Sequence, residues 1–244
     1  ISGTLDAAAS AGTPYTIVVT ASDGTASVDQ SFQLNVSNPD PVAVADTGAV
    51  AEDATLTVVA ASGVLSNDTD DDTRTVTGVV TGAVSGTSNL NTGSALVGAY
   101  GTLTLSANGS YTYVADQSAA DALAAGAHAS DVFTYTVSDA QGATAYATLT
   151  IDITGTNDTP VAVGTIGDVS RTDTQSVTVA TAGYFSGADS PTTFSYSARG
   201  LPAGVTINAS TGEISGTLGA AAGKAYTATT LPFSARRFLR PGSY

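Results

Sequence analysis

Hydrophobic and polar residues alternate most regularly in residues 132–159, VFTYTVSDAQGATAYATLTIDITGTNDT. Apolar residues hold every second position from Phe133 to Val137 and again from Ala147 to Ile153, and most positions between them are Thr or Ser. Such alternation buries one face of a strand and leaves the other in water. The intervening DAQG segment is typical of a turn, so this stretch predicts a β-hairpin.

Helical periodicity is nearly absent from the rest of the chain. Leu, Glu, Lys and other long-chain helix formers are scarce, whereas Thr, Val, Ser, Gly and Ala are abundant, which favours pleated strands joined by tight turns. Residues 117–125, QSAADALAA, predict one short helix that needs packing to be stable. Residues 83–100 are rich in Gly, Ser and Asn and predict a long loop or an irregular hairpin. We therefore expect an all-β protein.

One pentapeptide, ISGTL, occurs at residues 1–5 and again at residues 214–218. Each copy is followed by an Ala triplet, a Gly and a Tyr-Thr pair. The first copy continues into two alternating segments and ends at the linker NPDP, whereas the second gives way in residues 229–244 to TTLPFSARRFLRPGSY, which does not alternate. The two copies indicate parts of two repeats of one kind.

Two similar linkers, PDPVAVAD at residues 39–46 and NDTPVAVG at residues 157–164, enclose one further unit. The chain length also suits two or three small domains. Four parts are therefore predicted: the C-terminal half of a repeat (1–38), a complete β-sandwich (39–159), the N-terminal part of a repeat (160–228) and an atypical tail (229–244).

The charge narrows the range of partners. Acidic residues number 21 against 7 basic residues, for a formal net charge of −14, which argues against nucleic acid as a partner. No apolar run approaches the roughly 20 residues that span a bilayer, so membrane insertion is not expected. Cysteine is absent, which excludes disulfides and thiolate metal sites.

Four acidic residues crowd into residues 66–75, SNDTDDDTRT. Asp68, Asp70, Asp71 and Asp72 repel one another unless a cation or full solvation offsets the repulsion. Calcium suits such a loop, because it accepts roughly six to eight oxygen ligands in irregular geometry. The alternative is a solvated turn, since Asp favours turns without any metal.

Three segments of the central unit closely resemble the VCBS repeat of large bacterial surface and secreted proteins. They are YGTLTLSANGSYTY at residues 100–113, ALAAG at residues 122–126 and DVFTYTVSD at residues 131–139. The resemblance covers about residues 40–159. It implies a β-sandwich that serves as one module of an adhesin.

The segment GLPAGVTINASTGEISGTL, residues 200–218, resembles the dystroglycan-type cadherin-like or immunoglobulin-like (Ig) repeat that often stands beside VCBS repeats. Residues 1–37 resemble the second half of the same repeat. Together the resemblances imply tandem cadherin-like/Ig-like β-sandwich modules at an extracellular or bacterial cell-surface location. They do not identify what is bound.

The cadherin-like resemblance also implies calcium at two domain junctions. At the first junction it implies the ligands Asn38, Asp40, Asp70, Asp72 and Asp139. At the second junction it implies the ligands Glu52, Asn157, Asp158 and Asp189. The second set is the smaller, because GADSPTT keeps one acidic residue where two are expected.

No pattern of residues indicates an enzyme. His128, the sole His, lies in the polar segment AAGAHASD and is interpreted as a solvated loop residue rather than a general base. Asp116 and Asp121 flank the predicted helix, so capping or solvation explains them better than a glycosidase pair. Tyr111 and Tyr113 lie on one face of a strand, which favours core packing over a sugar-binding strip.

A structural extender of a bacterial cell-surface adhesin or extracellular filament is the function that the sequence favours. Its expected partners are neighbouring repeats of the same protein or identical subunits, head to tail. The alternative is a carbohydrate- or protein-binding adhesion module, which would need a concave pocket for a distal glycan or protein ligand.

The split repeat adds a hypothesis about assembly. Residues 13–37 contain a closing hairpin, and residues 160–228 contain the first part of a sandwich. The hairpin of one molecule could complete the sandwich of the next by donor-strand complementation, a contact that does not close on itself. The residues expected to face inward are Ile17, Val19, Phe32, Leu34 and Val36. The alternative is a tandem array with two ragged ends.

Overall fold

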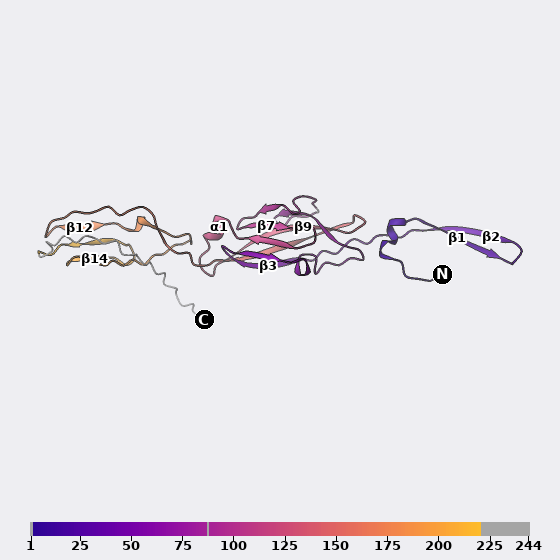
Figure 1. Ribbon diagram of the computed structural model, residues 1–244, viewed down its shortest axis with the longest axis horizontal. Helices are drawn as coiled ribbons and strands as arrows, with labels where there is room; N and C mark the ends of the chain where they lie inside the picture. Colours follow the sequence, from indigo (N-terminus) through magenta and orange to yellow (C-terminus); the bar gives the residue numbers. More distant parts are fainter. Residues whose placement is uncertain (1, 87, 221–244) are drawn as a thin grey trace. The chain divides into compact units, whose positions relative to one another are not determined.

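The computed structural model describes residues 2–86 and 88–220, and β-strands dominate it (Figure 1). The chain divides into two compact units, the first with residues up to 121 and residues 126–155, the second with residues 122–125 and those from 156 onward. Each unit is described by itself. In the described part of the chain, no helix is long and apolar enough to cross a membrane.

Strands and short helices follow one another closely, and η denotes a 3-10 helix. Those of the first unit are η1 (Ala7–Gly12), β1 (Tyr15–Ser22), β2 (Ser27–Leu34), β3 (Asp46–Ala51), β4 (Thr55–Val58), η2 (Ala60–Ser62), β5 (Thr75–Thr81), β6 (Ala95–Val97), β7 (Thr102–Leu105), β8 (Tyr111–Val114), α1 (Ser118–Asp121), β9 (His128–Ser138) and β10 (Thr144–Thr154). Those of the second unit are β11 (Val161–Ala162), β12 (Ser176–Val179), η3 (Ala182–Tyr184), β13 (Phe185–Ser186), β14 (Val205–Ile207) and β15 (Ile214–Thr217).

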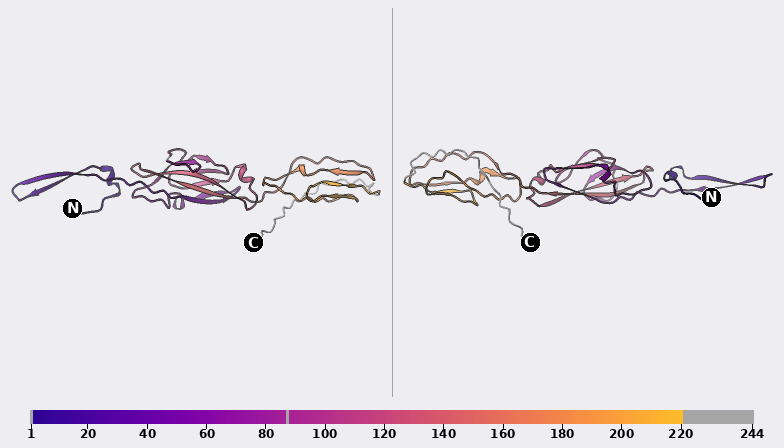
Figure 2. Two further views of the ribbon diagram at one scale, coloured as in Figure 1. Left: turned by 180° about the vertical axis from the view of Figure 1, so that it is seen from behind. Right: turned by 60° about the horizontal axis from the view of Figure 1, so that its bottom comes forward.

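Two four-stranded sheets form a β-sandwich in the first unit (Figure 2). One sheet has the order β3-β10-β9-β5, in which β3 runs parallel to β10 and the other pairs are antiparallel. The second sheet has the order β4-β8-β7-β6 and is antiparallel throughout. The hairpin predicted at residues 132–159 is confirmed as β9 and β10.

The core of the sandwich comes from the alternating apolar positions of both sheets. Its largest fully buried side chains are Val64, Val76, Val79, Leu103, Leu105, Tyr113, Phe133, Tyr135, Val137, Leu149, Ile151 and Ile153. The rings of Tyr113 and Phe133 meet edge to face, with centroids 6.3 Å apart. Tyr111 is buried as well, which confirms that the tyrosines of β8 pack into the core.

A buried carboxylate, that of Asp131 on β9, joins the two sheets. It accepts hydrogen bonds from the backbone N–H groups of Ala99, Tyr100 and Gly101 at 2.8, 3.1 and 3.1 Å. The hydroxyl of Tyr113, on β8 of the opposite sheet, donates a fourth at 2.6 Å. Four donors offset the cost of removing this carboxylate from water.

The hydroxyl of Tyr135 is the centre of a second buried polar group. It lies 2.9 Å from the Val44 carbonyl oxygen and from Asp46 Oδ2, and 3.3 Å from the Val64 carbonyl oxygen and from Asp68 Oδ1. Asp68 Oδ1 also accepts the backbone N–H of Val44 at 2.7 Å. Asp68 therefore links the backbone at Val44, two residues before β3, to the hydroxyl of Tyr135 in the core.

Of the two forms predicted for residues 83–100, the structure shows the irregular hairpin. The segment contains β6, which pairs antiparallel with the following strand β7. Its first part is held to β9 by two buried threonines. The backbone N–H of Val84 donates to Thr134 Oγ1 at 3.0 Å, and that of Ser88 donates to Thr136 Oγ1 at 2.7 Å. The helix predicted at residues 117–125 is shorter than expected, since α1 covers one turn.

The described residues of the second unit form two small sheets. One pairs β11 with β13, and the other has the order β12-β15-β14, both antiparallel. Tyr196 is buried between Phe185 and Phe194, with ring centroids 6.0 and 6.1 Å from theirs. The predicted tail, residues 229–244, lies outside the described residues.

Strands β1 and β2 form a two-stranded sheet of their own. The expectation that the apolar residues of this hairpin face inward concerned a contact with another molecule, and it stays a prediction. Val19, Phe32 and Leu34 are exposed because β1 and β2 pair only with each other among the described strands.

Replacing Tyr135 with Phe should lower the free energy of unfolding by about 1–3 kcal/mol, because the buried acceptors around its hydroxyl lose their donor. Tyr146→Phe on the neighbouring strand is the matched control, since Tyr146 is 45% exposed. Urea denaturation of both variants measures the difference, and equal losses would contradict the role given to the Tyr135 hydroxyl.

Burial raises the pKa of Asp46 and of Asp68, and the hydrogen bonds that they accept offset it only in part. Because the folded pKa lies above the unfolded value, these groups stabilise the fold at low pH and lose that contribution as pH rises through the folded pKa. Titration of the carboxyl carbon signals by NMR should place both midpoints above the ordinary Asp value of about 3.9. Midpoints at or below that value would show that the two carboxylates are not desolvated.

Candidate metal centre

Three carboxylates of the first unit gather beside the turn that joins β9 to β10. Asp139 begins this turn, and Asp70 and Asp72 come from the segment that leads into β5. One carboxylate oxygen of each residue lies within 4.8 Å of the others. Asp71, which lies between Asp70 and Asp72 in the sequence, is exposed. We call Asp70, Asp72 and Asp139 the acidic cluster.

The turn itself fixes the Asp139 carboxylate. Its Oδ1 accepts the backbone N–H groups of Gln141, Gly142 and Ala143 at 3.0, 2.6 and 2.8 Å, and its Oδ2 accepts the Asn38 amide at 2.5 Å. Burial acts to raise the pKa of Asp139, but these hydrogen bonds, led by that of Asn38, outweigh it and lower the pKa. The folded protein therefore favours the ionised form of Asp139, the form that could bind a cation.

Asp70 and Asp72 contribute oxygens that the chain does not satisfy. Asp70 Oδ2 and Asp72 Oδ2 are each shielded from solvent and have no hydrogen-bond donor among the described residues. Two carboxylates about 5 Å apart repel each other by roughly 3 kcal/mol at an effective dielectric constant of ~20. A cation between them would remove both costs.

The donor set points to the class of cation. All three members of the acidic cluster offer carboxylate oxygens, and His and Cys do not take part. Hard oxygen donors suit calcium, magnesium or manganese, whereas zinc and copper sites use imidazole or thiolate. The residues present therefore fit a hard divalent cation.

Of the two other residues predicted at this junction, one lies at the cluster. Asn38 contacts Asp139 directly, and the Ser10 hydroxyl lies 3.4 Å from the Asn38 amide oxygen. Asp40 is exposed and does not belong to the group of neighbouring carboxylates. Asp68, in the same acidic run, instead serves Tyr135 and Val44 in the core.

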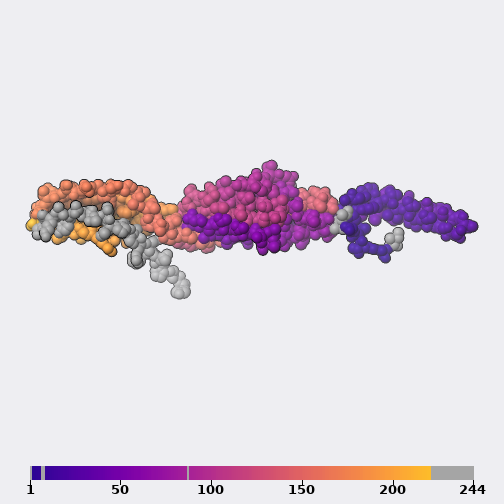
Figure 3. Space-filling model, in the orientation of Figure 1, coloured from indigo at the N-terminus to yellow at the C-terminus, as the bar shows by residue number. Residues whose placement is uncertain are grey.

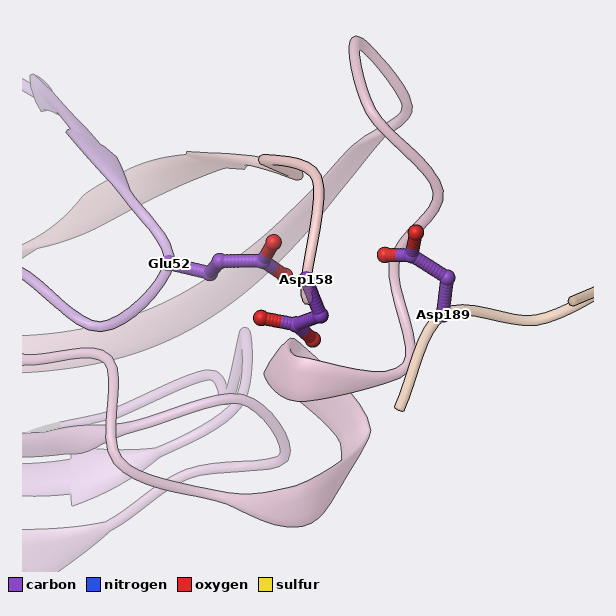
Figure 4. A group of neighbouring side chains, drawn as sticks. All are labelled: Glu52, Asp158 and Asp189. Atoms are coloured by element: carbon purple, nitrogen blue, oxygen red, sulfur yellow. The ribbon is translucent and has the colours of Figure 1, made fainter. Parts of the chain in front are cut away.

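The residues predicted at the second junction are divided between the two units (Figure 4). Glu52 is a buried residue of the first unit, in the turn that follows β3. Asn157 and Asp158 precede β11 in the second unit, and the buried Asp189 follows β13. The second calcium site stays a prediction.

Two residue sets considered for catalysis have other surroundings. His128 is the first residue of β9 rather than part of a loop, and its Nδ1 lies 3.2 Å from the Asp152 carboxylate in an exposed pair. Asp116 accepts a hydrogen bond from the Thr102 hydroxyl at 3.0 Å, and Asp121 ends α1. These contacts are those of surface residues.

Sequence reasoning missed the buried role of Asp131. A signal was available, because Asp131 has the same parity in the alternating pattern as Phe133, Tyr135 and Val137 and therefore belongs to the inward face. For Asp46 the pattern gives no such signal. Its strand, DTGAVA, has no run of large apolar residues at alternate positions, and none of its residues is fully buried.

Comparison with protein-family models gives two matches. Residues 38–155 match the model described as "Bacterial cadherin-like domain", and residues 159–235 match the one described as "Putative Ig domain". Neither description is that of an enzyme family. A comparison with the curated proteins gave no match. The narrower resemblance to the VCBS repeat stays a prediction.

Several solved structures are distantly similar. The protocadherin GammaB4 extracellular domain is 13% identical, with 79% of this chain and 32% of that chain covered and a TM-score of 0.42. Cadherin domains 1–4 of protocadherin Gamma B7 are 15% identical, with 86% and 50% covered and a TM-score of 0.40. Domains EC1-3 of mouse protocadherin-24 are 16% identical, with 83% and 65% covered and a TM-score of 0.34.

This chain thus spans between about a third and two thirds of those structures. At such scores the likeness adds no support to the fold, which rests on the two domain models and on the observed sheets. The all-β architecture and the two matches agree: residues 38–155 are similar to a bacterial cadherin-like domain and residues 159–235 to an Ig domain, and the fold class is that of tandem cadherin-like/Ig-like β-sandwich modules.

Proposed function

We propose that this chain is a structural extender of a bacterial cell-surface adhesin or extracellular filament, built from VCBS-type and Ig-type modules and stiffened by calcium. Tandem cadherin-like and Ig-like domains support an adhesin-like extracellular module. The single observation that carries the calcium proposal is the acidic cluster, with its two buried and unsatisfied carboxylate oxygens.

Calcium would act here by joining three separate segments. Asn38 is the first residue of the cadherin-like match and lies in the linker NPDP, Asp70 and Asp72 belong to the segment before β5, and Asp139 belongs to the turn after β9. A cation held by all three would restrict the linker relative to the domain, because each ligand removes rotational freedom from the chain. Such restriction is what an extender needs, since its task is to keep a distal part at a distance.

The module would have no catalytic task of its own. The exposed His128–Asp152 pair and the structural hydrogen bonds of Asp116 and Asp131 leave these residues without the nucleophile–base geometry that hydrolysis needs. Partners in this role are neighbouring repeats of the same protein or identical subunits placed head to tail.

A binding module for a glycan or a protein is the alternative function. The first unit has a hollow of about 460 Å³ beside the acidic cluster, lined by Ser10, Ala11, Thr13, Val36, Asn38, Ala140 and Gln141. The lining offers no aromatic ring on which a sugar could stack, and one of its polar side chains, that of Asn38, is already bonded to Asp139. The extender function is therefore the better supported of the two.

Calcium should raise the melting temperature of the chain by several degrees, because it binds the folded state and stabilises it by about 2.7 kcal/mol at a hundredfold excess over its dissociation constant. Asp72→Ala should abolish this shift. Without calcium the variant should melt no lower than the wild type, since one repelling charge has been removed. Scanning calorimetry in calcium and in chelator measures both effects.

The matched control is Asp71→Ala, which removes the same charge from an exposed position next to the cluster. It should keep the calcium shift of the wild type. Superimposable wild-type curves in calcium and in chelator would refute the calcium site, as would equal shifts for the Asp71 and Asp72 variants.

A further inference from the structure

Five of the eight asparagines of this chain lie in the pattern Asn-x-Ser/Thr, in which x is not Pro. This pattern, the sequon, is the acceptor sequence for N-linked glycans on exported proteins. The five are Asn35, Asn67, Asn108, Asn157 and Asn208. Asn and Ser are also common in turns that carry no glycan, so the pattern alone does not select an acceptor. The contacts of each amide group do.

Asn108 lies in the turn that joins β7 to β8. The backbone of this turn is fixed: the Gly109 N–H donates to the Ser106 carbonyl oxygen at 2.9 Å. The Gly109 carbonyl oxygen accepts the Val64 N–H at 3.0 Å. Gly109 is buried, whereas Asn108 beside it is exposed. The part of the chain that includes β7 and β8, magenta in Figure 3, lies at the surface of the first unit.

The amide of Asn108 is held through its oxygen. Its Oδ1 accepts the backbone N–H of Ser110 at 3.1 Å and the Ser110 hydroxyl at 2.7 Å. Among the described residues, no group accepts a hydrogen bond from Asn108 Nδ2. The fold therefore uses the oxygen of this amide and presents the nitrogen, the atom that would carry a sugar, to solvent.

Two other sequons have the opposite arrangement. Asn67 Nδ2 donates to the carbonyl oxygens of Val44 and Ala45, each at 3.4 Å. Asn157 Nδ2 donates to the Asp158 carbonyl oxygen at 3.2 Å. In both cases the nitrogen that would carry the sugar is bonded to the chain itself.

Asn208 is the counterpart of Asn108 in the second unit. It lies between β14 and β15, which correspond to β7 and β8, because the sheet order β12-β15-β14 repeats the order β4-β8-β7. Its Oδ1 accepts the backbone N–H groups of Ser210 and Thr211 at 2.9 and 3.0 Å. In the described part of the chain, the Ser210 hydroxyl makes no hydrogen bond to this amide. The contact between the sequon hydroxyl and the amide oxygen therefore distinguishes Asn108 from Asn208.

That contact bears on the chemistry of an amide. The nitrogen lone pair of an amide is delocalised into its carbonyl group, so the nitrogen becomes a nucleophile only as it loses a proton. The negative charge that then develops lies largely on the oxygen. In Asn108 that oxygen already has two donors from Ser110, and donors fixed in advance at a developing oxyanion lower the barrier to reaction.

We propose that Asn108 is an N-glycan acceptor and that Ser110 is the residue that positions and activates its amide. The co-substrate is an activated sugar, joined through its anomeric carbon to a phosphate. A base of the transferase takes one proton from Nδ2, and Nδ2 forms a bond to the anomeric carbon. The bond between that carbon and the phosphate oxygen breaks, and the phosphate leaves with the electron pair. This modification goes beyond the extender role and does not involve the acidic cluster.

Peptide mapping of the full chain, isolated from the cells that produce it, tests the site. Cleavage on the amino side of Asp gives a peptide of residues 72–115, which contains the sequon of Asn108 and no other. We expect this peptide to carry an added sugar, which fragment ions place on Asn108. A single added hexose indicates a nucleotide-linked donor, and an added oligosaccharide indicates a lipid-linked donor. An unmodified peptide overturns the proposal.

Substitutions in the same turn test the role of Ser110. Ser110→Ala should lower the occupancy of Asn108 at least about tenfold, because loss of one donor to a developing oxyanion typically slows a reaction by about 10²-fold or more. Ser110→Thr should keep the wild-type occupancy, since it keeps the hydroxyl. Ser106→Ala is the matched control, which removes a hydroxyl outside the sequon and should change nothing. Equal occupancy in the two Ala variants would overturn the role of Ser110.

Asn208 separates activation by the fold from simple recognition of the sequon. The same digest reports it in a peptide of residues 189–244, which contains no other sequon. A transferase that reads the sequence alone would modify Asn108 and Asn208 equally. Because Asn208 lacks the hydroxyl contact, we expect its occupancy to be at least about tenfold lower. Equal occupancy would overturn activation by Ser110, and none of these readouts depends on the calcium shift.

Discussion

The antiparallel pairing of β9 with β10 is the constraint on which the cadherin-like domain depends. These two strands lie at the centre of one sheet and are the partners of both outer strands, β3 and β5. They also contribute half of the largest buried side chains, which lie on a single face because the register pairs Phe133 with Leu149. The turn between the strands positions Asp139 at the acidic cluster. One hairpin therefore sets the sheet, the core and the candidate metal centre, and a change in its register would shift all three.

Aspartate serves three different purposes in this acidic chain, and the donors around each carboxylate distinguish them. Asp131 accepts four hydrogen bonds and links the sheets from within. Asp23 and Asp139 accept backbone N–H groups in turns; those hydrogen bonds, led by that of Ala26, lower the pKa of Asp23 to about 2. Asp70 and Asp72 keep oxygens that no group of the described chain satisfies. The proposed calcium site rests on this last arrangement together with the Asp139 carboxylate.

The alternating pattern predicted the β9–β10 hairpin and the inward face of β8, because periodicity of two reports directly on which side of a strand is buried. It could not assign Asp68, which stands beside Asp70 in the sequence yet bonds to Tyr135 in the core. The different surroundings of Asp68 and Asp70 depend on the contact between Asp68 and the backbone of Val44, which lies 24 positions earlier in the chain. A pattern of neighbouring residues does not report such a contact. Exposure of the β1–β2 hairpin was likewise beyond the pattern, since alternation shows an apolar face but not what covers it.

The parallel pairing of β3 with β10 has a mechanical consequence. Strand β3 lies near the start of the cadherin-like domain and β10 at its end, and six residue pairs from Asp46–Leu149 to Ala51–Thr154 join them. Tension on the two ends of the domain pulls these parallel strands in opposite directions along their length. All the hydrogen bonds of the ladder are then loaded together in shear, instead of being peeled apart one by one. A module with this topology resists being stretched between its two ends.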